Sequence, residues 1–158
     1  MDHITPEQRS AVMRKVRGKD TTPEWKVRRL IHGMGYRYRL HGGGASGLPG
    51  KPDLIFAGRK KAIFVHGCFW HMHEGCPRNR IPEARREEYW LPKLTRNVER
   101  DRENARKIAE MGWTMLVIWE CETAKAGLDQ LRDRIAEFLG QPRTRRNNSL
   151  SSLTTSGR

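Results

Sequence analysis

Six consecutive residues decide the fold class of this chain: Thr114-Met115-Leu116-Val117-Ile118-Trp119. Their nearly continuous apolar character is typical of a central β-strand that is buried on both faces. The stretch before them, Pro92 to Met111, repeats apolar residues at helical spacing and is ended by Gly112. The stretch after them, Leu128 to Leu139, predicts a last amphipathic helix. A strand between two helices indicates an α/β fold.

The N-terminal half adds two helices and three strands to this prediction. Thr5-Pro6-Glu7-Gln8 carries the capping signals of a short basic helix that runs to about Arg17. Thr22-Pro23-Glu24 repeats the start signal for a helix whose apolar stripe begins at Trp25. Three strand candidates follow, at Tyr36 to Leu40, Leu54 to Ala57 and Ala62 to Val65, with a glycine-rich loop at Gly42 to Gly50.

The charge of the chain narrows the class of partner. Its 158 residues include 31 Lys and Arg against 18 Asp and Glu, a formal net charge of +13. This excess favours nucleic acid, because each cation placed at a phosphate releases a counterion. A membrane surface is the weaker alternative, since no segment pairs a basic face with a bulky apolar one. A solvated surface tuned for solubility is the other alternative.

The expected setting is soluble and cytoplasmic. No apolar run reaches the roughly 18 residues that a transmembrane helix needs, and the start Met1-Asp2-His3 lacks the pattern of a secretory signal. An odd number of cysteines, three, argues against a disulfide framework. After Gly140 the chain is rich in Gln, Arg, Asn, Ser and Thr and has no acidic residue, which predicts a disordered tail over residues 141–158.

The densest chemistry lies in the eleven residues from His66 to Cys76, which contain three His and two Cys. Zinc takes four Cys or His ligands in a tetrahedron. Cys68, His73 and Cys76 supply three, and Cys121 at the end of the last strand is the remaining cysteine. The spacing therefore predicts a closed Cys3His zinc site, with reduced core cysteines and surface histidines as the alternative.

Four further residues are candidates for catalysis. His66 and His71 remain once zinc has taken one histidine, and they suit either general acid and base roles or ordinary polar contacts. Asp53 opens the second strand, where a carboxylate could hold Mg²⁺ against a phosphate or simply cap a turn. Glu24 in a first helical turn could equally complement the helix dipole.

Three large aromatic residues stand outside any apolar period. Phe69 and Trp70 lie in the polar loop, and Trp90 lies close to Lys93 and Asn97. Aromatic side chains held at a basic surface could wedge between base pairs. Burial beneath the metal loop is the alternative interpretation.

Four strings together carry a family resemblance: Leu48-Pro49-Gly50-Lys51-Pro52-Asp53, Ile63-Phe64-Val65-His66-Gly67-Cys68-Phe69-Trp70-His71, Asn97-Val98-Glu99-Arg100-Asp101 and Val117-Ile118-Trp119-Glu120-Cys121. With them the chain resembles the very short patch repair endonucleases, the Vsr-type DNA mismatch endonucleases, from about His3 to Leu139. The resemblance implies a restriction-endonuclease-like core, a mixed central sheet flanked by helices, with a structural zinc. It implies an enzyme that nicks duplex DNA 5′ to the thymine of a T:G mismatch and so starts very short patch repair of deaminated 5-methylcytosine.

The resemblance also implies residue roles. It makes Asp53 and the main-chain carbonyl of Val65 the protein ligands of Mg²⁺, His66 and His71 the catalytic histidines, and Glu24 the support of one of them. His71 is then the expected general base, and His66 the contact to phosphate or metal-bound water. The zinc ligands implied are the same four as above, namely Cys68, His73, Cys76 and Cys121.

The implied DNA contacts fall into three groups. Phe69, Trp70 and Trp90 match the aromatic residues that wedge beside the mismatch. Met13 matches a residue that reaches DNA from the opposite groove, and the residues placed to read bases are Lys93 and Asn97. The strand Phe64-Val65-His66 departs from the acidic-x-Lys pattern of the wider nuclease superfamily, so the role of that lysine must pass to histidine.

The expected organisation is a DNA-contacting helical segment at residues 1–20, a zinc-containing endonuclease domain at 21–140 and the basic tail. The expected partner is double-stranded DNA with a T:G mismatch, with mismatch-repair proteins as candidate partners, no membrane, and a monomeric enzyme associated with a bacterial nucleoid. Two alternatives are a nuclease of this fold with another DNA target and a zinc-stabilised DNA-binding module without catalysis. The joint presence of Asp53, His66 and His71 opposes the second, because binding alone needs none of them.

Overall fold

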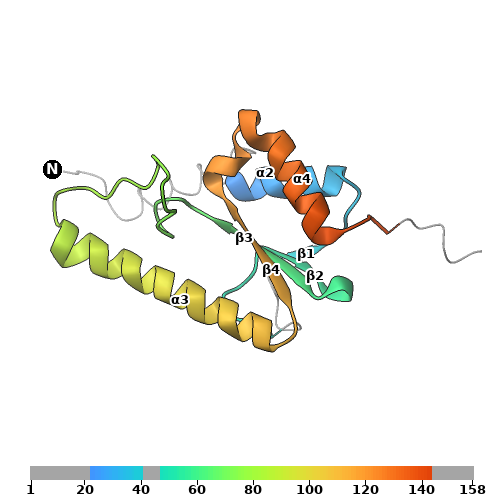
Figure 1. Cartoon of the computed structure of the whole chain (residues 1–158), viewed down its shortest axis with the longest axis horizontal. Helices are drawn as coiled ribbons and strands as arrows, with labels where there is room; N and C mark the ends of the chain where they lie inside the picture. The colour runs from blue at the N-terminus through green and yellow to red at the C-terminus, as the bar shows by residue number, and fades with distance from the viewer. Residues whose placement is uncertain (1–21, 41–46, 144–158) are drawn as a thin grey trace, which may run out of the picture.

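A computed structural model describes residues 22–40 and 47–143. The helix expected from Thr5 to Arg17, with Met13, lies outside these residues. The helices and strands in chain order are α2 (Pro23–Gly33), β1 (Arg39–Leu40), β2 (Leu54–Phe56), β3 (Lys61–His66), α3 (Leu91–Glu110), β4 (Thr114–Trp119) and α4 (Leu128–Leu139) (Figure 1). Short helical turns connect them at η1 (Ala57–Arg59), η2 (Arg86–Trp90), η3 (Glu120–Thr123) and η4 (Lys125–Gly127).

The strands form one mixed sheet in the order β1-β2-β3-β4. β1 pairs with β2, and β2 with β3, in antiparallel fashion, whereas β3 and β4 run parallel. The mixed sheet with flanking helices confirms the α/β expectation. One detail of that prediction is wrong: within the described residues β4 is an edge strand, and β3 lies in the interior of the sheet.

The apolar run of β4 has a physical explanation in the helices on either side of the sheet. In Figure 1, α2 and α4 cover one face and α3 covers the other. Alternate β4 residues serve the two faces, since Leu116 and Ile118 pack towards α2 and α4 while Met115 and Val117 pack on the α3 side. The apolar run therefore indicates that both faces of β4 are covered. It does not indicate how many strands pair with β4.

Two clusters of buried side chains fill the spaces between sheet and helices. The α2 and α4 side holds Val27, Ile31, Tyr36, Leu54, Phe56, Ile63, Ile118, Leu131, Ile135 and Leu139. The smaller α3 side holds Leu48, Ile55, Ala62, Phe64 and Ile108. Neither cluster includes His66, the polar residue at the carboxyl end of β3.

The helices and strands follow the local sequence signals, except for the length of β1 and the exposure of Trp25. Thr22 caps α2 by accepting the main-chain N–H of Trp25 at 3.4 Å, and Gly112, with φ +80°, follows α3 as expected. The strand expected from Tyr36 shrinks to two residues because β2 offers only Leu54 and Ile55 as partners. Trp25 was expected in the apolar stripe, but it is 42% exposed while Val27 and Ile31 are buried.

No helix in residues 22–40 and 47–143 is long and apolar enough to cross a membrane.

Candidate active site

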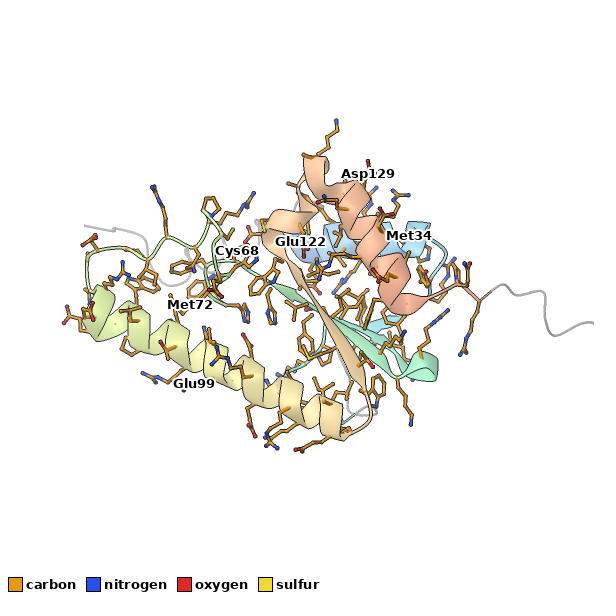
Figure 2. The ribbon with its side chains drawn as sticks, in the orientation of Figure 1. Met34, Cys68, Met72, Glu99, Glu122 and Asp129 are labelled. Atoms are coloured by element: carbon orange, nitrogen blue, oxygen red, sulfur yellow. The ribbon has the colours of Figure 1, made fainter. Side chains whose placement is uncertain are left out.

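The chemistry-bearing residues gather at the carboxyl ends of two parallel strands. β3 ends at His66 and β4 ends at Trp119, and these two residues are register partners. The chain leaves β3 through the loop that carries Cys68 and Met72, which Figure 2 places between the sheet and the first turns of α3. The loop therefore meets the end of β4 on one side and α3 on the other.

Three side chains of this loop and one from η3 form a cluster that could hold a metal ion. The donor atoms of Cys68, His73, Cys76 and Cys121 all lie within 4.8 Å of one another. The Sγ of Cys121 and Nδ1 of His73 are 3.5 Å apart, and the His73 ring stacks on Trp119 at 4.1 Å between centroids. Three sulfurs and one imidazole nitrogen at this separation suit a tetrahedral ion such as zinc. The four predicted ligands are thus brought together, and zinc as the ion stays a prediction.

The local backbone explains how ligands so close in sequence converge. The N–H of His73 donates to the carbonyl of Cys68 at 2.9 Å, and the N–H of Cys76 donates to that of His73 at 3.3 Å. These two turns fold the loop back on itself. Burial raises the pKa of the Cys68 thiol to about 12. A metal bound here must displace that proton, which makes metal affinity depend on pH.

A second cluster joins the two candidate catalytic histidines to a residue that sequence reasoning missed. The rings of His66 and His71 stack at 3.8 Å with 6° between their planes. Nδ1 of His71 lies 2.6 Å from Oδ2 of Asp101 on α3. Such a bond orients the ring and leaves its Nε2 for other work. Asp101 stands four residues after Asn97 in a helical segment, and that spacing is the one signal that could have placed it on the same face.

His66 sits in a protected position at the end of β3, with 8% of the residue exposed. Burial, followed by the charge of His71, lowers its pKa to about 4, against the opposing charge of Asp101. His66 is therefore uncharged near neutral pH. It can offer a neutral donor or acceptor to a phosphate or a water molecule.

Asp53 stands beside these histidines at the entrance to β2. Its main-chain N–H donates to the carbonyl of Ile63 at 3.0 Å, and its Oδ2 accepts the N–H of Val65 at 2.7 Å. The N–H and C=O of one strand residue lie on the same edge, so the Val65 carbonyl faces the Asp53 side. Asp53, Val65, His66, His71 and Asp101 all line a cavity of about 150 Å³.

Glu24 lies in the neighbouring cavity. It forms an ion pair with Arg28, one turn further along α2. The cavity has a volume of about 530 Å³ and is also lined by Trp25, Asp53 and Val65. Glu24 and Asp53 therefore share this cavity, whereas His71 lines the smaller one.

The three predicted wedge residues form one cluster, which we call the aromatic cluster: Phe69, Trp70 and Trp90. The ring centroids lie 5.0 Å apart for Phe69 and Trp70, 5.4 Å for Phe69 and Trp90, and 6.2 Å for Trp70 and Trp90. Trp70 is 47% exposed, so burial does not account for it. The ammonium of Lys93 lies 5.5 Å from the Trp70 ring, and Asn97 donates to the Trp70 carbonyl at 3.1 Å. Both α3 residues thereby support the loop.

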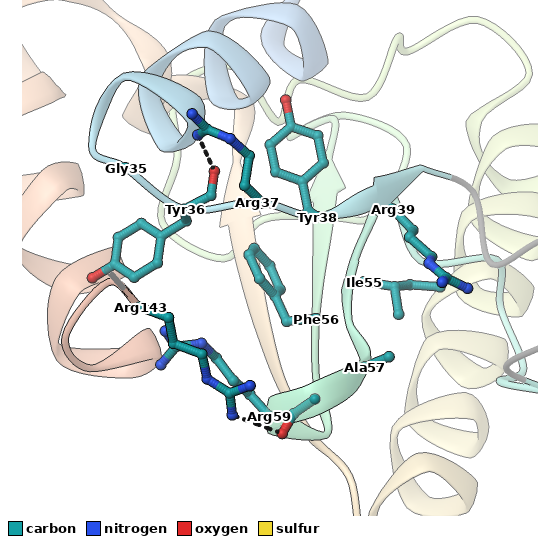
Figure 3. A pocket seen from close by; sticks show the side chains of 11 residues that line it. Gly35, Tyr36, Arg37, Tyr38, Arg39, Ile55, Phe56, Ala57, Arg59 and Arg143 are labelled. Carbon is teal, nitrogen blue, oxygen red and sulfur yellow. Dashed lines mark hydrogen bonds between the residues drawn. The ribbon is translucent and has the colours of Figure 1, made fainter. Parts of the chain in front are cut away.

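A separate cavity of about 480 Å³ lies at β1 and β2, lined by none of the described candidate residues (Figure 3). The guanidinium groups of Arg59 and Arg143 are engaged with main-chain carbonyls. Arg59 donates to the carbonyls of Leu139 and Gln141 at 2.6 and 2.8 Å, and Arg143 donates to that of Gly58 at 3.3 Å. These bonds tie the end of α4 to η1, which is a structural role.

The known proteins that this chain resembles are all described as DNA mismatch endonucleases or nicking enzymes. The family profile described as DNA mismatch endonuclease Vsr matches residues 1–78. The chain is 44% identical over 133 residues to the type II nicking enzyme V.XorIIP of Xanthomonas oryzae pv. oryzae, covering 84% of this chain and 94% of that protein. It is 40% identical over 125 residues to the DNA mismatch endonuclease Vsr of Escherichia coli strain K12, covering 79% and 76%. It is 39% identical over 121 residues to the type II nicking enzyme V.NmeAIP of Neisseria meningitidis serogroup A, covering 77% and 83%.

Proposed function

Because this chain belongs to the Vsr family and is a DNA endonuclease, we propose that it nicks one strand of duplex DNA 5′ to the thymine of a T:G mismatch. Such a nick would start very short patch repair of a deaminated 5-methylcytosine. The observation that carries the proposal is the cavity shared by Asp53, His66, His71 and Asp101, with the exposed indole of Trp70 next to His71 in the loop after β3. A binding module would need neither the cavity nor its carboxylates.

The oxygen atoms beside β3 fit a hard divalent cation. The carboxylate of Asp53 and the main-chain carbonyl of Val65 would be the protein ligands of Mg²⁺, which prefers oxygen and keeps several waters. When bound, Mg²⁺ would supply Lewis-acid polarisation of the scissile phosphate and stabilisation of the departing 3′ oxygen. The protein contributes the position, because the hydrogen bond from Val65 to Asp53 fixes the carboxylate.

The histidines divide the work of moving the proton and contacting the phosphate. His71 takes the proton of the attacking water at Nε2, since its Nδ1 is engaged with Asp101. His66, uncharged and stacked on His71, contacts the phosphate or an ordered water. Water, base and phosphate are then held in one geometry, and positioning of this kind lowers a barrier substantially.

The aromatic cluster supplies the choice of substrate. Wedging a side chain between base steps costs a few kcal/mol of stacking and pairing, and the cost is least at a mismatched pair. The exposed indole of Trp70, backed by Phe69 and Trp90, is the side chain placed to do this. Selection of the mismatch thus rests on the ease of opening as much as on contacts to bases.

Asp101 is a positioning residue, and its replacement gives a specific test. Asp101→Asn is expected to reduce kcat by up to about 10⁴-fold, the cost of losing the carboxylate that orients a general-base histidine, with little change in KM. Asp101→Glu should recover part of the rate. The matched control is Glu99→Gln, an exposed carboxylate on the same helix (Figure 2) that is not among the residues lining the cavity. An Asp101→Asn enzyme with wild-type kcat would remove Asp101 from this role.

The experiment that tests the function is a nicking assay over a panel of duplexes with Mg²⁺. The panel holds T:G, matched T:A and C:G, and other mismatches, each with varied flanking bases and a label on either strand. We expect cleavage of the thymine strand alone, at the phosphate 5′ to the mispaired thymine. Equal nicking of matched duplexes would indicate a nuclease of this fold with another target. Binding without cleavage under all conditions would indicate a DNA-binding module.

The remaining expectations accompany this proposal. We expect the enzyme to act as a monomer on duplex DNA in the bacterial cytoplasm, with mismatch-repair proteins as candidate partners. The roles of Met13, Lys93 and Asn97 in DNA contact stay predictions. Sedimentation of the protein with and without a T:G duplex would test the monomer.

A further inference from the structure

Trp25 is a large aromatic residue that the proposed mechanism leaves unused. It lies in the first turn of α2 and is 42% exposed, although tryptophan at this spacing is expected in an apolar core. Among the described residues, its indole helps to line the cavity of about 530 Å³ that also contains Asp53 and Val65. An exposed indole beside the candidate catalytic carboxylate is available to contact a bound ligand.

The two cavities meet at Asp53. Asp53 and Val65 line both the 150 Å³ cavity of the histidines and the 530 Å³ cavity of Trp25. His66, His71 and Asp101 complete the lining of the first cavity, and Glu24, Trp25 and Glu120 contribute to the second, so both adjoin the candidate catalytic carboxylate. A DNA strand with its scissile phosphate at Asp53 would therefore pass beside both cavities.

The lining of the Trp25 cavity indicates which part of a nucleotide it accepts. Glu24, Asp53 and Glu120 all line it, with Glu24 paired to Arg28 and Glu120 paired to Arg78 at 3.2 Å, so its acidic side chains are hydrogen-bond acceptors. A neutral base with amino groups suits them, because carboxylates accept hydrogen bonds from such groups. The guanidinium of Arg28 lies 5.5 Å from the Trp25 ring centre and holds the indole in place. The exposed part of the ring remains available for stacking.

Building on the proposed function, we propose that this cavity binds the nucleotide immediately 5′ of the scissile phosphate, with its base stacked on the Trp25 indole. The mispaired thymine follows the scissile phosphate on its 3′ side, and the aromatic cluster is proposed to wedge beside that thymine. Base stacking on an aromatic side chain is worth about 1–3 kcal/mol, so loss of the indole should weaken binding of DNA about tenfold. The cavity thus positions the nucleotide that keeps the 3′ oxygen after the nick.

The test measures Kd for a labelled T:G duplex by fluorescence anisotropy without a divalent ion, and kcat and KM with Mg²⁺. Trp25→Ala should raise Kd and KM about tenfold, in line with the stacking energy of one base, and Trp25→Phe should recover most of the affinity. Met111→Ala is the matched control, because Met111 is 44% exposed at the far end of α3 and should leave Kd unchanged. Thermal unfolding of each variant separates a loss of contact from a loss of fold.

A second duplex makes the result decisive. It carries an abasic site at the nucleotide 5′ of the scissile phosphate, so no base remains to stack. Wild-type protein should bind it about as weakly as Trp25→Ala binds the intact duplex, and Trp25→Ala should cause no further loss. Equal Kd for wild type and Trp25→Ala, or the same fold loss on both duplexes, overturns this inference. A wild-type protein that does not nick T:G duplexes instead overturns the proposed function, which the duplex panel measures separately.

Discussion

Asp53→Asn is expected to lower the nicking rate on a T:G duplex by about 10³-fold or more, the scale on which removal of an electrostatic stabiliser of a transition state acts. Asparagine keeps an oxygen that can accept the N–H of Val65, which Asp53 holds at 2.7 Å. The entrance to β2 should therefore stay folded. The change removes the negative charge, which is the property that a Mg²⁺ ligand supplies.

The measurement is a single-turnover rate with saturating enzyme, so that binding does not enter. Asp53→Ala tests the second role of the side chain, because it removes the charge and the acceptor together, and its melting temperature should fall below that of Asp53→Asn. Asp129→Asn, an exposed carboxylate at the start of α4, is the matched control and should nick at the wild-type rate. Equal rates for Asp53→Asn and wild type would show that the carboxylate has no part in the chemistry.

Cys121→Ser is expected to release the bound metal and lower the melting temperature by at least about 10 °C. A structural zinc contributes several kcal/mol of folding free energy, and about 1 kcal/mol shifts the melting temperature of a domain of this size by 2–4 °C. Cys121 lies in η3, whereas the other three ligands lie in the loop after β3. Loss of the Cys121 thiol therefore removes the link between η3 and the loop after β3, which are distant in the sequence.

Metal content of the purified protein, together with thermal unfolding, measures this effect. His73→Asn should behave like Cys121→Ser, and His32→Asn is the matched control because His32 is an exposed histidine in the last turn of α2. Treatment of wild type with a chelator should reproduce the lower melting temperature. Full metal occupancy and unchanged stability in Cys121→Ser would show that the Cys3His assignment is wrong.

Local sequence signals predicted the helices and strands well, because caps, glycines and apolar spacing act over a few residues. The start of α2 at Thr22 and the six-residue span of β4 are examples. The place of β4 at the edge of the described sheet could not be predicted in this way. Its apolar run depends on α3 covering one face and on α2 and α4 covering the other, and that is a tertiary arrangement.

The candidate site likewise contains residues that sequence signals could predict and residues that depend on the tertiary arrangement. Cys121 could be predicted as a partner of a loop some 45 residues earlier because zinc demands a fourth ligand and the chain has no other cysteine. No comparable chemical requirement pointed to Asp101, because one aspartate on a helix rich in Arg and Glu has the pattern of a solvated side chain. Trp25 was assigned to the core because apolar spacing records which face a residue occupies but does not show where the helix ends relative to the sheet.

In the proposed mechanism, two adjacent residues of the loop after β3 link recognition of the mismatch to the rate of cleavage. Trp70 and His71 are consecutive, and the donors of Cys68 and His73 flank them within the cluster that could hold a metal. The side chain proposed to enter the duplex and the one proposed to take the proton thus share a peptide unit about 3.8 Å long. When a matched duplex does not admit the Trp70 indole, the backbone that carries the general base His71 is displaced as well. In the proposed mechanism, misreading a substrate would consequently lower the turnover number as well as the affinity, a form of kinetic discrimination that requires no moving domain.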